Sequence, residues 1–333
     1  MLILGIDTSC DDTAASVVED GSRIISNVVS SQNEIHKKHG GIVPELASRR
    51  HLEMILPVVD EALARTGMQL GDISAIAVTR GPGLIGSLLV GVCFAKALSF
   101  IHRIPLVSVN HIEGHIFSIF LESGPEFPFL ALVVSGGHTS IYRIDGFREY
   151  VEIGRTRDDA AGEAYDKVAK LLGFGYPGGP VIDALAADGN PGAIAFPRKV
   201  IQGSFDFSFS GLKTSVLTHL KKYPHSKKED VAASFQSAVV EILSKRLMEV
   251  AKAEGIKRIV LSGGVSANSS LRSYVKQKAL DEGIEVYLPS LNLCTDNAAM
   301  IAAAGYVHFI NGDMADFTLN PQAYMPLGGS AHG

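Results

Sequence analysis

The sequence has few cysteines, no long lipid-suited run and no basic segment at its start. Its three cysteines, Cys10, Cys93 and Cys294, are scattered and odd in number, so we expect no disulfide framework and a cytoplasmic location. An apolar strand reaches Asp7 without a basic n-region, so we expect no signal peptide. Gly, Ser, Lys or Pro interrupts the apolar runs, so we expect no membrane span of ~20 residues and no membrane partner.

The chain also lacks an excess of positive charge. Thirty basic and 35 acidic residues give a net charge of −5 over 333 residues. This argues against a protein that coats nucleic acid broadly, but it leaves room for a local basic patch. Two basic stretches, at 36–39 and 49–51, are equally compatible with contacts to a nucleic-acid backbone and with solvated helix faces.

A strand–turn–strand–turn–strand pattern occurs twice, over residues 2–30 and again from Phe129, which predicts an internal repeat. Residues 258–268 repeat its first part as a strand, a Gly-Gly turn and a helix start. Small residues after a strand let the backbone approach a phosphate or nucleoside, so the pattern favours a nucleotide held between two related lobes. Helices are expected over 42–63, 86–102, 159–172, 230–254 and 296–309, with an exposed connection over 221–230.

The segment Asn110-His111-Ile112-Glu113-Gly114-His115 follows an apolar strand. Asn110 is a good N-cap, so a helix is expected to begin there. His111 and His115 are then one turn apart on nearly the same face, where two neutral imidazoles can bind one metal ion. The alternative, two ordinary histidines near a helix start, is about equally compatible with the bare pair.

The pair differs from a zinc-protease motif, in which the glutamate directly follows the first histidine. Here Glu113 is two residues on, roughly 200° around the helix from His111. It cannot act as a protease base on the face that carries the histidines.

Eight motifs occur in an order that identifies a family, and together they span about residues 2–326: GIDTSCD at 5–11, HIEGH at 111–115, SGGHT at 135–139, DAAGEAYDK at 159–167, YPGGP at 176–180, FSFSGLKT at 207–214, GGVSAN at 263–268 and CTDNAAM at 294–300. The chain resembles the bacterial TsaD family, once described as O-sialoglycoprotein endopeptidases. The resemblance implies an α/β, actin-like (ASKHA) fold. This fold has two duplicated ribonuclease H-like lobes, with the active site in the cleft between them. We expect residues 1–109 plus 297–326 in the first lobe, 110–296 in the second, and a flexible tail over 327–333.

The resemblance also implies a reaction. Family members transfer the threonylcarbamoyl group of threonylcarbamoyl-adenylate to N6 of adenosine 37, forming N6-threonylcarbamoyladenosine and releasing AMP. The acceptors are tRNAs that read codons beginning with adenine. Two other readings of the same fold are a sugar- or acetate-kinase-like phosphotransferase and a non-catalytic scaffold. Neither gives the histidine pair a purpose.

By the same resemblance, the metal ligands are His111, His115 and Asp296. They would bind one Fe²⁺ or Zn²⁺ per subunit and leave coordination sites open. The sequence alone favours an N-cap role for Asp296, since a helix is expected to begin there, and the resemblance reverses that preference. The residues implied to contact the substrate are Val134, Ser135, Gly136, Gly137, His138, Asp166, Gly179, Asp183 and Asn268; the aspartates could otherwise be solvated helix residues, and Gly179 a turn glycine.

The adenine N6 is a poor nucleophile that needs a base or tight positioning. Asp11 and Asp12, in the first turn, are our candidates for base or orienter. Many family members have glutamate where this chain has Asp12, and the shorter side chain reaches less far. Cys10 has no assignable base, so we expect it to be a packing residue.

The resemblance implies four partners: tRNA, a homologous TsaB-like subunit in a heterodimer, a TsaE-like ATPase, and a TsaC-like enzyme that supplies the adenylate. The apolar helix expected over 86–102 is our candidate for pairing with the TsaB-like subunit.

Overall fold

The computed structural model describes residues 1–199 and 201–330 and divides into two compact units. One comprises Met1–Gly124 and Thr295–Leu327, and the other comprises Pro125–Cys294 and the residues from Gly328 on. These boundaries differ from those expected at 109/110 and 296/297. Residues 110–124 belong with the first unit because the helix after Asn110 packs against the helix after Asn297.

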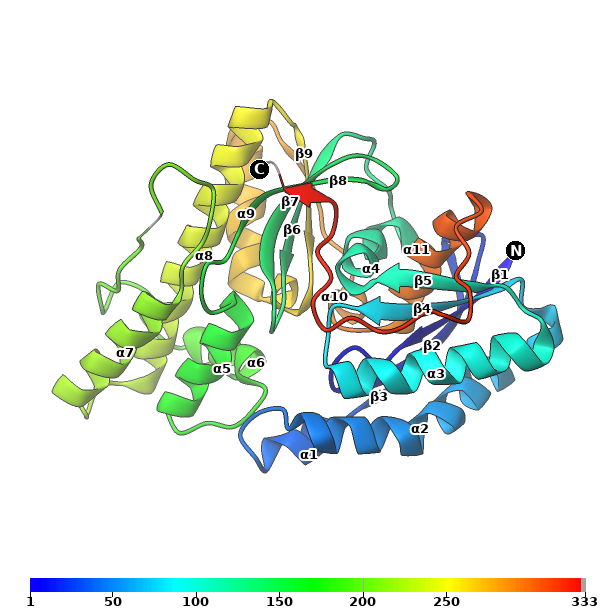
Figure 1. Cartoon of the computed structure of the whole chain (residues 1–333). Coiled ribbons are helices and arrows are strands. Elements are labelled where there is room, and N and C mark those ends of the chain that lie inside the picture. Colours follow the sequence, from blue (N-terminus) through cyan, green and yellow to red (C-terminus); the bar gives the residue numbers. More distant parts are fainter. Residues whose placement is uncertain (200, 331–333) are drawn as a thin grey trace. The chain divides into compact units, whose positions relative to one another are not determined.

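The first unit contains a five-stranded sheet in the order β3-β2-β1-β4-β5 (Figure 1). The first three strands form an antiparallel meander, and β4 and β5 are parallel to β1. The bounds are β1 Leu2–Asp7, β2 Asp12–Glu19, β3 Arg23–Ser31, β4 Ala75–Gly81 and β5 Leu106–Asn110; the helices are α1 Asn33–Lys37, α2 Pro44–Ala64, α3 Ile85–His102, α4 His111–Phe117 and α11 Ala298–Ile310, with 3₁₀ turns at Leu70–Asp72 and Ser118–Leu121.

The second unit repeats this topology, with a six-stranded sheet in the order β10-β9-β6-β7-β8-β11. Strands β6, β7 and β8 form the meander, while β9 and β10 are the parallel pair. The bounds are β6 Phe129–Val134, β7 Thr139–Gly146, β8 Glu149–Arg155, β9 Arg258–Ser262, β10 Glu285–Tyr287 and β11 Gly329–Ser330; the helices are α5 Ala161–Leu171, α6 Gly178–Ala186, α7 Ser210–Lys222, α8 Lys228–Glu254, α9 Ser269–Asp281 and α10 Leu291–Cys294, with a 3₁₀ turn at Gly264–Ala267.

The predicted duplication is therefore confirmed, and one detail changes. The segment 258–268 forms the predicted strand, turn and helix start, and its strand β9 is parallel to β6, so it corresponds to β4 of the first unit and not to β1. The expected helices are present, with ends shifted by a few residues, and the exposed connection shortens to residues 223–227. In the predicted tail, Gly329–Ser330 pairs with β8, and residues 331–333 lie outside the described part of the chain.

The two-residue period of β1 assigns its faces to different helices. Leu4 and Ile6 share a core cluster with Ile55 of α2 and Val92 of α3. Gly5 faces α11, and a Cβ added to it would lie 2.2 Å from the carbonyl oxygen of Ala298. The strand and the helix therefore pack through backbone contact at this point.

We expect Gly5→Ala to lower the free energy of unfolding by about 1–3 kcal/mol, because the new methyl group must displace the α11 backbone. Chemical denaturation of both proteins measures this. Gly71→Ala is the matched control, since nothing lies within 4 Å of its added Cβ. Equal small effects of the two substitutions would show that α11 moves away from β1 at little cost.

Within the described residues, α3 is long and apolar enough to cross a membrane by length and composition. The sequence predicted no membrane span of about 20 residues, and this helix has 18. One such helix is weak evidence for a span, since core helices pass the same test. Leu88, Val92 and Ala95 of α3 are buried within the first unit.

Candidate metal centre and substrate contacts

The predicted helix start after β5 is confirmed. The Asn110 side chain accepts a hydrogen bond from the Ile112 amide at 2.8 Å, which caps α4. His111 and His115 occupy the first and fifth positions of the helix, and their ring centroids lie 4.7 Å apart. The cap thus stabilises the first turn of α4, which contains His111 and leads to His115.

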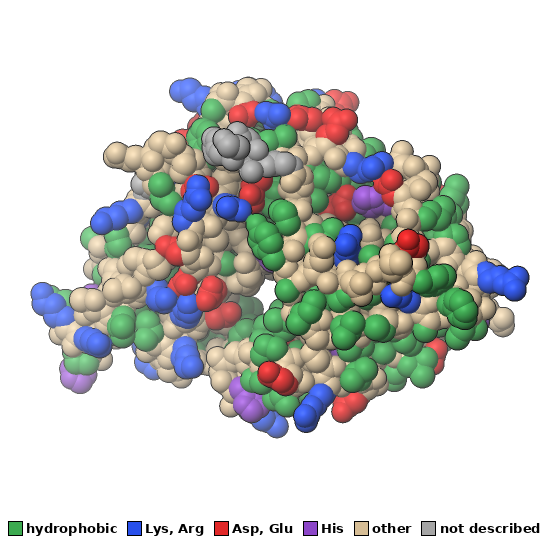
Figure 2. Space-filling view, viewed as in Figure 1, with side chains coloured by type: hydrophobic (Ala, Val, Ile, Leu, Met, Phe, Trp, Pro, Cys, Tyr) green, Lys and Arg blue, Asp and Glu red, His purple; other side chains and the backbone are tan. Residues whose placement is uncertain are grey.

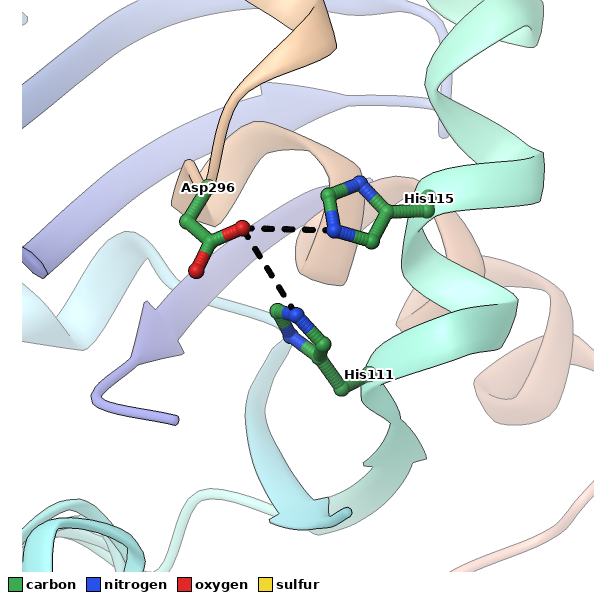
Figure 3. Close-up of side chains that lie close together, drawn as sticks. All are labelled: His111, His115 and Asp296. Carbon is green, nitrogen blue, oxygen red and sulfur yellow. Dashed lines mark ion pairs between the residues drawn. The ribbon is translucent and has the colours of Figure 1, made fainter. Parts of the chain in front are cut away.

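Asp296 completes the group that sequence reasoning proposed (Figure 3). Its Oδ1 lies 3.2 Å from Nε2 of His115 and 3.6 Å from Nε2 of His111. One ligand atom from each of the three residues lies within 4.8 Å of the others. Residues from α4 and from the segment before α11, far apart in sequence, therefore meet in the first unit.

The alternative role of Asp296, as a helix N-cap, is wrong. The cap of α11 is Asn297, whose side chain accepts a hydrogen bond from the Met300 amide at 3.1 Å. Asp296 precedes the cap, so its carboxylate is turned toward the histidines instead of the helix amides.

The unsatisfied polar atoms of this group fit a cation. Among the described residues, neither ring nitrogen of buried His115 has a hydrogen-bond partner. Buried polar atoms are normally paired, so this concentration calls for a missing partner. Two imidazoles and one carboxylate suit a first-row transition metal such as zinc or iron.

Asp7 is a member of this site that sequence reasoning did not assign. It ends β1, and its Oδ2 lies 3.6 Å from Nδ1 of His111. Burial raises the pKa of Asp7, while His111 opposes that rise. A carboxylate behind a metal-binding histidine usually fixes the ring's tautomer and orientation. The signal was available, because Asp7 lies in the GIDTSCD motif directly after a strand.

Glu113 points away from the two histidines, as its helix position predicted. It is 3% exposed, and its carboxylate lies 3.0 and 3.1 Å from Nε2 of His308 on α11. Asp313 contacts the other ring nitrogen of His308 at 3.1 Å. Although burial opposes a charge on this ring, the two carboxylates raise the pKa of His308. This buried pair holds α4 against α11.

The acidic turn between β1 and β2 carries two of the proposed catalytic groups. Asp11 is buried, and the buried Oδ1 of Asp12 has no hydrogen-bond partner among the residues that the structure describes. Burial, with the charges of Asp296 and Asp11, raises the pKa of Asp12 to about 7. Burial also raises the pKa of the Cys10 thiol well above its usual range, which keeps it protonated at neutral pH.

In the second unit, the proposed substrate residues 134–138 form a tight turn after β6. The Ser135 amide donates to the carbonyl of His138 at 2.8 Å, and the His138 amide donates to Oγ of Ser135 at 3.2 Å. Gly136 and Gly137 are exposed, and nothing lies within 4 Å of a Cβ added to either. Packing therefore does not require these glycines, and the open space leaves room for a ligand.

The other proposed substrate residues lie on helices of the same unit. Asp166 accepts a hydrogen bond from the Gly178 amide at 2.7 Å, and the space beside Gly179 is open. Asp183 accepts from the side chains of Gln236, Asn268 and Ser269 and from the Ser269 amide. It is thus a connecting residue of α6, α8 and α9, and not the solvated helix residue of the alternative reading.

A cavity of about 350 Å³ lies beside this network, lined by Asp183, Gln236, Ser237, Ser269 and Tyr274 among others. Its size is within the range of small-molecule sites. Gln236 was not singled out from the sequence. Its amide oxygen accepts from Asn268 at 2.7 Å while its nitrogen donates to Asp183 at 3.0 Å, so it connects two of the proposed substrate residues.

The two basic stretches proposed for a nucleic-acid backbone are only partly on the surface. His36 and His51 are both fully buried. His51 contacts the hydroxyl of Thr13 and the carbonyl of Cys10, so it supports the acidic turn. The structure therefore contradicts a surface role for these two histidines, since their rings fill the interior.

Three solved structures have a similar fold at low sequence identity. HypF in its phosphate- and nucleotide-bound form matches with a TM-score of 0.63 and 16% identity, over 93% of this chain and 46% of HypF. A 2-hydroxyglutaryl-CoA dehydratase component of Acidaminococcus fermentans matches with a TM-score of 0.55 and 17% identity, over 92% and 98%. The ROK hexokinase of Thermus thermophilus matches with a TM-score of 0.52 and 15% identity, over 94% and 100%. These likenesses confirm the actin-like fold alone.

Relatives found by sequence are much more similar to this chain than the three solved structures are. A protein of Thermodesulfovibrio yellowstonii named tRNA N6-adenosine threonylcarbamoyltransferase is 58% identical, over 98% of this chain and all of the relative. A protein of Trichlorobacter lovleyi with the same name is 55% identical, over 98% and 97%. The family model TsaD, tRNA N6-adenosine threonylcarbamoyltransferase, matches residues 23–303. With the histidine–aspartate group and the duplicated fold, these matches show that the chain belongs to the TsaD family of tRNA N6-adenosine threonylcarbamoyltransferases.

Proposed function

We propose that this chain transfers the threonylcarbamoyl group of threonylcarbamoyl-adenylate to N6 of adenosine 37 in tRNAs that read codons beginning with adenine. The bond from N6 to the carbamoyl carbon forms as the bond from that carbon to the phosphate oxygen breaks. AMP leaves, and N6 loses a proton. The observation that carries the proposal is the group of His111, His115 and Asp296 in a chain 58% identical to a named transferase.

We infer that these three residues bind one Fe²⁺ or Zn²⁺. When bound, such an ion polarises a carbonyl oxygen or anchors a substrate carboxylate. Asp7 would orient His111 from behind, through its carboxylate 3.6 Å from Nδ1. The choice between the two metals is left to measurement, since both accept this donor set.

The proton on N6 needs an acceptor, and Asp12 is our first candidate with Asp11 as orienter. In the metal-free protein a pKa of about 7 places the protonation change of Asp12 near neutral pH, where a general base is most effective. The position departs from the glutamate common in the family, and burial and neighbouring carboxylates make Asp12 more basic than an ordinary aspartate.

We assign the adenylate to the second unit. The open Gly136-Gly137 turn would bring backbone amides to its phosphate, with Val134, Ser135 and His138 around it. Asp166, Gly179, Asp183 and Asn268 would contact the nucleoside or the acyl group. The cavity beside Asp183 supports this assignment because it lies within the same unit.

A phosphotransferase or a scaffold would share the fold but not the metal group. The likeness to a hexokinase is at 15% identity and concerns the fold alone. Neither alternative requires two buried imidazoles beside a carboxylate. The transferase is therefore the favoured reading.

We further propose a TsaB-like partner on α3. Ile85, Leu89, Cys93, Ala97 and Ile101 recur every four residues and are all exposed, Ile101 by 69%. This apolar row, with Leu52 and Leu56 of α2, forms the hydrophobic surface over α2 and α3 in Figure 2. Surfaces of this kind mark protein contacts. A TsaE-like ATPase, a TsaC-like supplier of the adenylate and a cytoplasmic location complete the proposal.

The experiment is a transfer assay. The chain is incubated with its partner proteins, threonylcarbamoyl-adenylate and unmodified tRNA, and digested tRNA is analysed by mass spectrometry for threonylcarbamoyladenosine. We expect product that requires this chain. No product, with partners shown to be active by a control homologue, would overturn the proposal.

A further inference from the structure

The most basic part of the chain is the segment 207–228, which has five lysines, two histidines and no acidic residue. It contains the FSFSGLKT motif, which the proposed reaction leaves without a role. It forms α7, the connection that follows it and the first residue of α8. In a chain of net charge −5, this concentration of positive charge stands apart.

The start of the segment is fixed by the loop that precedes α5. Asp158 accepts hydrogen bonds from the side chains of Ser208 and Ser210 and from the Phe209 amide. Lys213 is paired with Asp159 at 2.7 Å. Asp159 neutralises the positive charge of Lys213 at the start of α7, and the Asp158 hydrogen bonds hold the helix in place. The FSFSGLKT motif therefore has a structural role.

The far end of the segment carries four lysines, Lys221, Lys222, Lys227 and Lys228, which we call the lysine corner. All four are exposed, and none forms an ion pair within residues 1–199 and 201–330. Lys222 and Lys228 lie over the rings of Tyr223 and Phe174, and Lys227 donates to the carbonyl of Asp188. Figure 2 shows lysine or arginine and histidine side chains at the end of the molecule where Figure 1 places α7.

Several basic residues of the first unit are not available to a ligand. In the first unit, Arg50 and Arg65 are paired with glutamates, and His36 and His51 are buried. Acidic groups do border the lysine corner, namely Asp188 at the end of α6 and Glu229 and Asp230 in the first turn of α8. The Asp230 carboxylate accepts a hydrogen bond from the Asn190 amide at 2.8 Å, so it points toward the segment that follows α6.

We propose that the lysine corner binds the phosphate backbone of the tRNA substrate, with Tyr223 and His225 available to stack on an unpaired base. This inference rests on the proposed function, which supplies the tRNA. Exposed lysines that form no ion pair with the described residues neutralise phosphates at little cost, and an aromatic side chain among them is typical of nucleic-acid surfaces. Tyr223 is 50% exposed, so part of its ring is open to solvent beside Lys222 and His219.

The test uses direct binding of unmodified tRNA to the full chain with its partner proteins, measured over a series of salt concentrations. Two double variants, Lys221→Ala with Lys222→Ala and Lys227→Ala with Lys228→Ala, are compared with the wild type. We expect each to weaken binding about tenfold at low salt. Each should also make the slope of log affinity against log salt shallower by about 1.5–2, since two phosphate contacts are lost.

The matched control replaces Lys252 and Lys276, two exposed lysines of the same unit, with alanine. We expect its affinity and slope to equal those of the wild type, and KM for threonylcarbamoyl-adenylate to be unchanged in every variant. Unchanged tRNA affinity in the corner variants, or an equal loss in the control, would overturn the proposal. A wild type that binds tRNA through the corner but forms no threonylcarbamoyladenosine would instead overturn the proposed function and leave the surface in place.

Discussion

Asp296→Asn will remove bound metal and lower threonylcarbamoyl transfer by more than 100-fold while leaving the chain folded. The substitution keeps the shape of the side chain and removes the charge that faces both imidazoles, at 3.2 and 3.6 Å. Loss of a residue behind a ligand typically costs 10–100-fold in metal affinity, so loss of a ligand should cost more. Metal content after purification without a histidine tag, with transfer measured by mass spectrometry, gives both readouts.

Thermal unfolding separates a metal ligand from a structural carboxylate. Without metal, Asp296 raises the pKa of buried Asp12, and this repulsion disfavours the charged forms. The metal-free Asn variant should therefore be at least as stable as the metal-free wild type. A ligand at 100 times its Kd adds about 2.7 kcal/mol, so added Zn²⁺ or Fe²⁺ should stabilise only the wild type.

The control for this series is His102→Ala, which removes an exposed imidazole from the same unit. It should keep full metal content and full transfer. If Asp296→Asn retains one metal per chain, the proposed ligand set is incorrect. If it loses the metal and still transfers at the wild-type rate, the metal has no part in the reaction.

The sequence was sufficient for the topology, because the repeated meander and its glycine turns are local patterns. It was also sufficient for the histidine pair, since an N-cap and a four-residue spacing determine which face both rings share. The position of Asp296 was harder to predict. An aspartate at an expected helix start resembles a cap, and only the structure reveals that the next residue, Asn297, performs that role.

Contacts between distant segments could not be predicted. Glu113 and His308 are 195 residues apart, and nothing in either local pattern indicates that the two side chains meet. The same holds for His51, which looked like a surface residue in a basic stretch but is buried behind the acidic turn. His308 and His51 each have a polar partner inside the protein. The spacing of residues in one sequence does not indicate which distant side chains will pair.

Glu113→Gln will destabilise the protein by roughly 2 kcal/mol, because it leaves His308, whose side chain is 17% exposed, in a partly buried site without its main counter-charge. Asp313 remains, but its side chain is about one-third exposed and its pairing with the ring is weaker for that reason. Chemical denaturation in the presence of a chelator measures the change. The control is Glu61→Gln, which breaks an exposed pair with Arg65 and should cost no more than about 1 kcal/mol.

The destabilisation should depend on pH in a stated direction. The pKa of His308 is raised in the folded protein above the ordinary value of 6.5. The pair's contribution is therefore fully present below about pH 6.5 and is lost as the pH rises through the raised value. The difference in stability between wild type and Glu113→Gln should be largest near pH 6 and should shrink at alkaline pH. A difference that grows with pH would mean that His308 is neutral when folded.

Glu113 lies between the two histidines in sequence but on the opposite side of α4, so its contact with α11 sets the orientation of the helix that carries them. Loosening that contact should lower metal affinity by about 10–100-fold, as for other residues that support ligands indirectly. Titration of the folded variant with Zn²⁺ measures this apart from stability. An unchanged affinity would show that the Asn110 cap alone orients α4, and that the buried pair contributes to stability without shaping the metal centre.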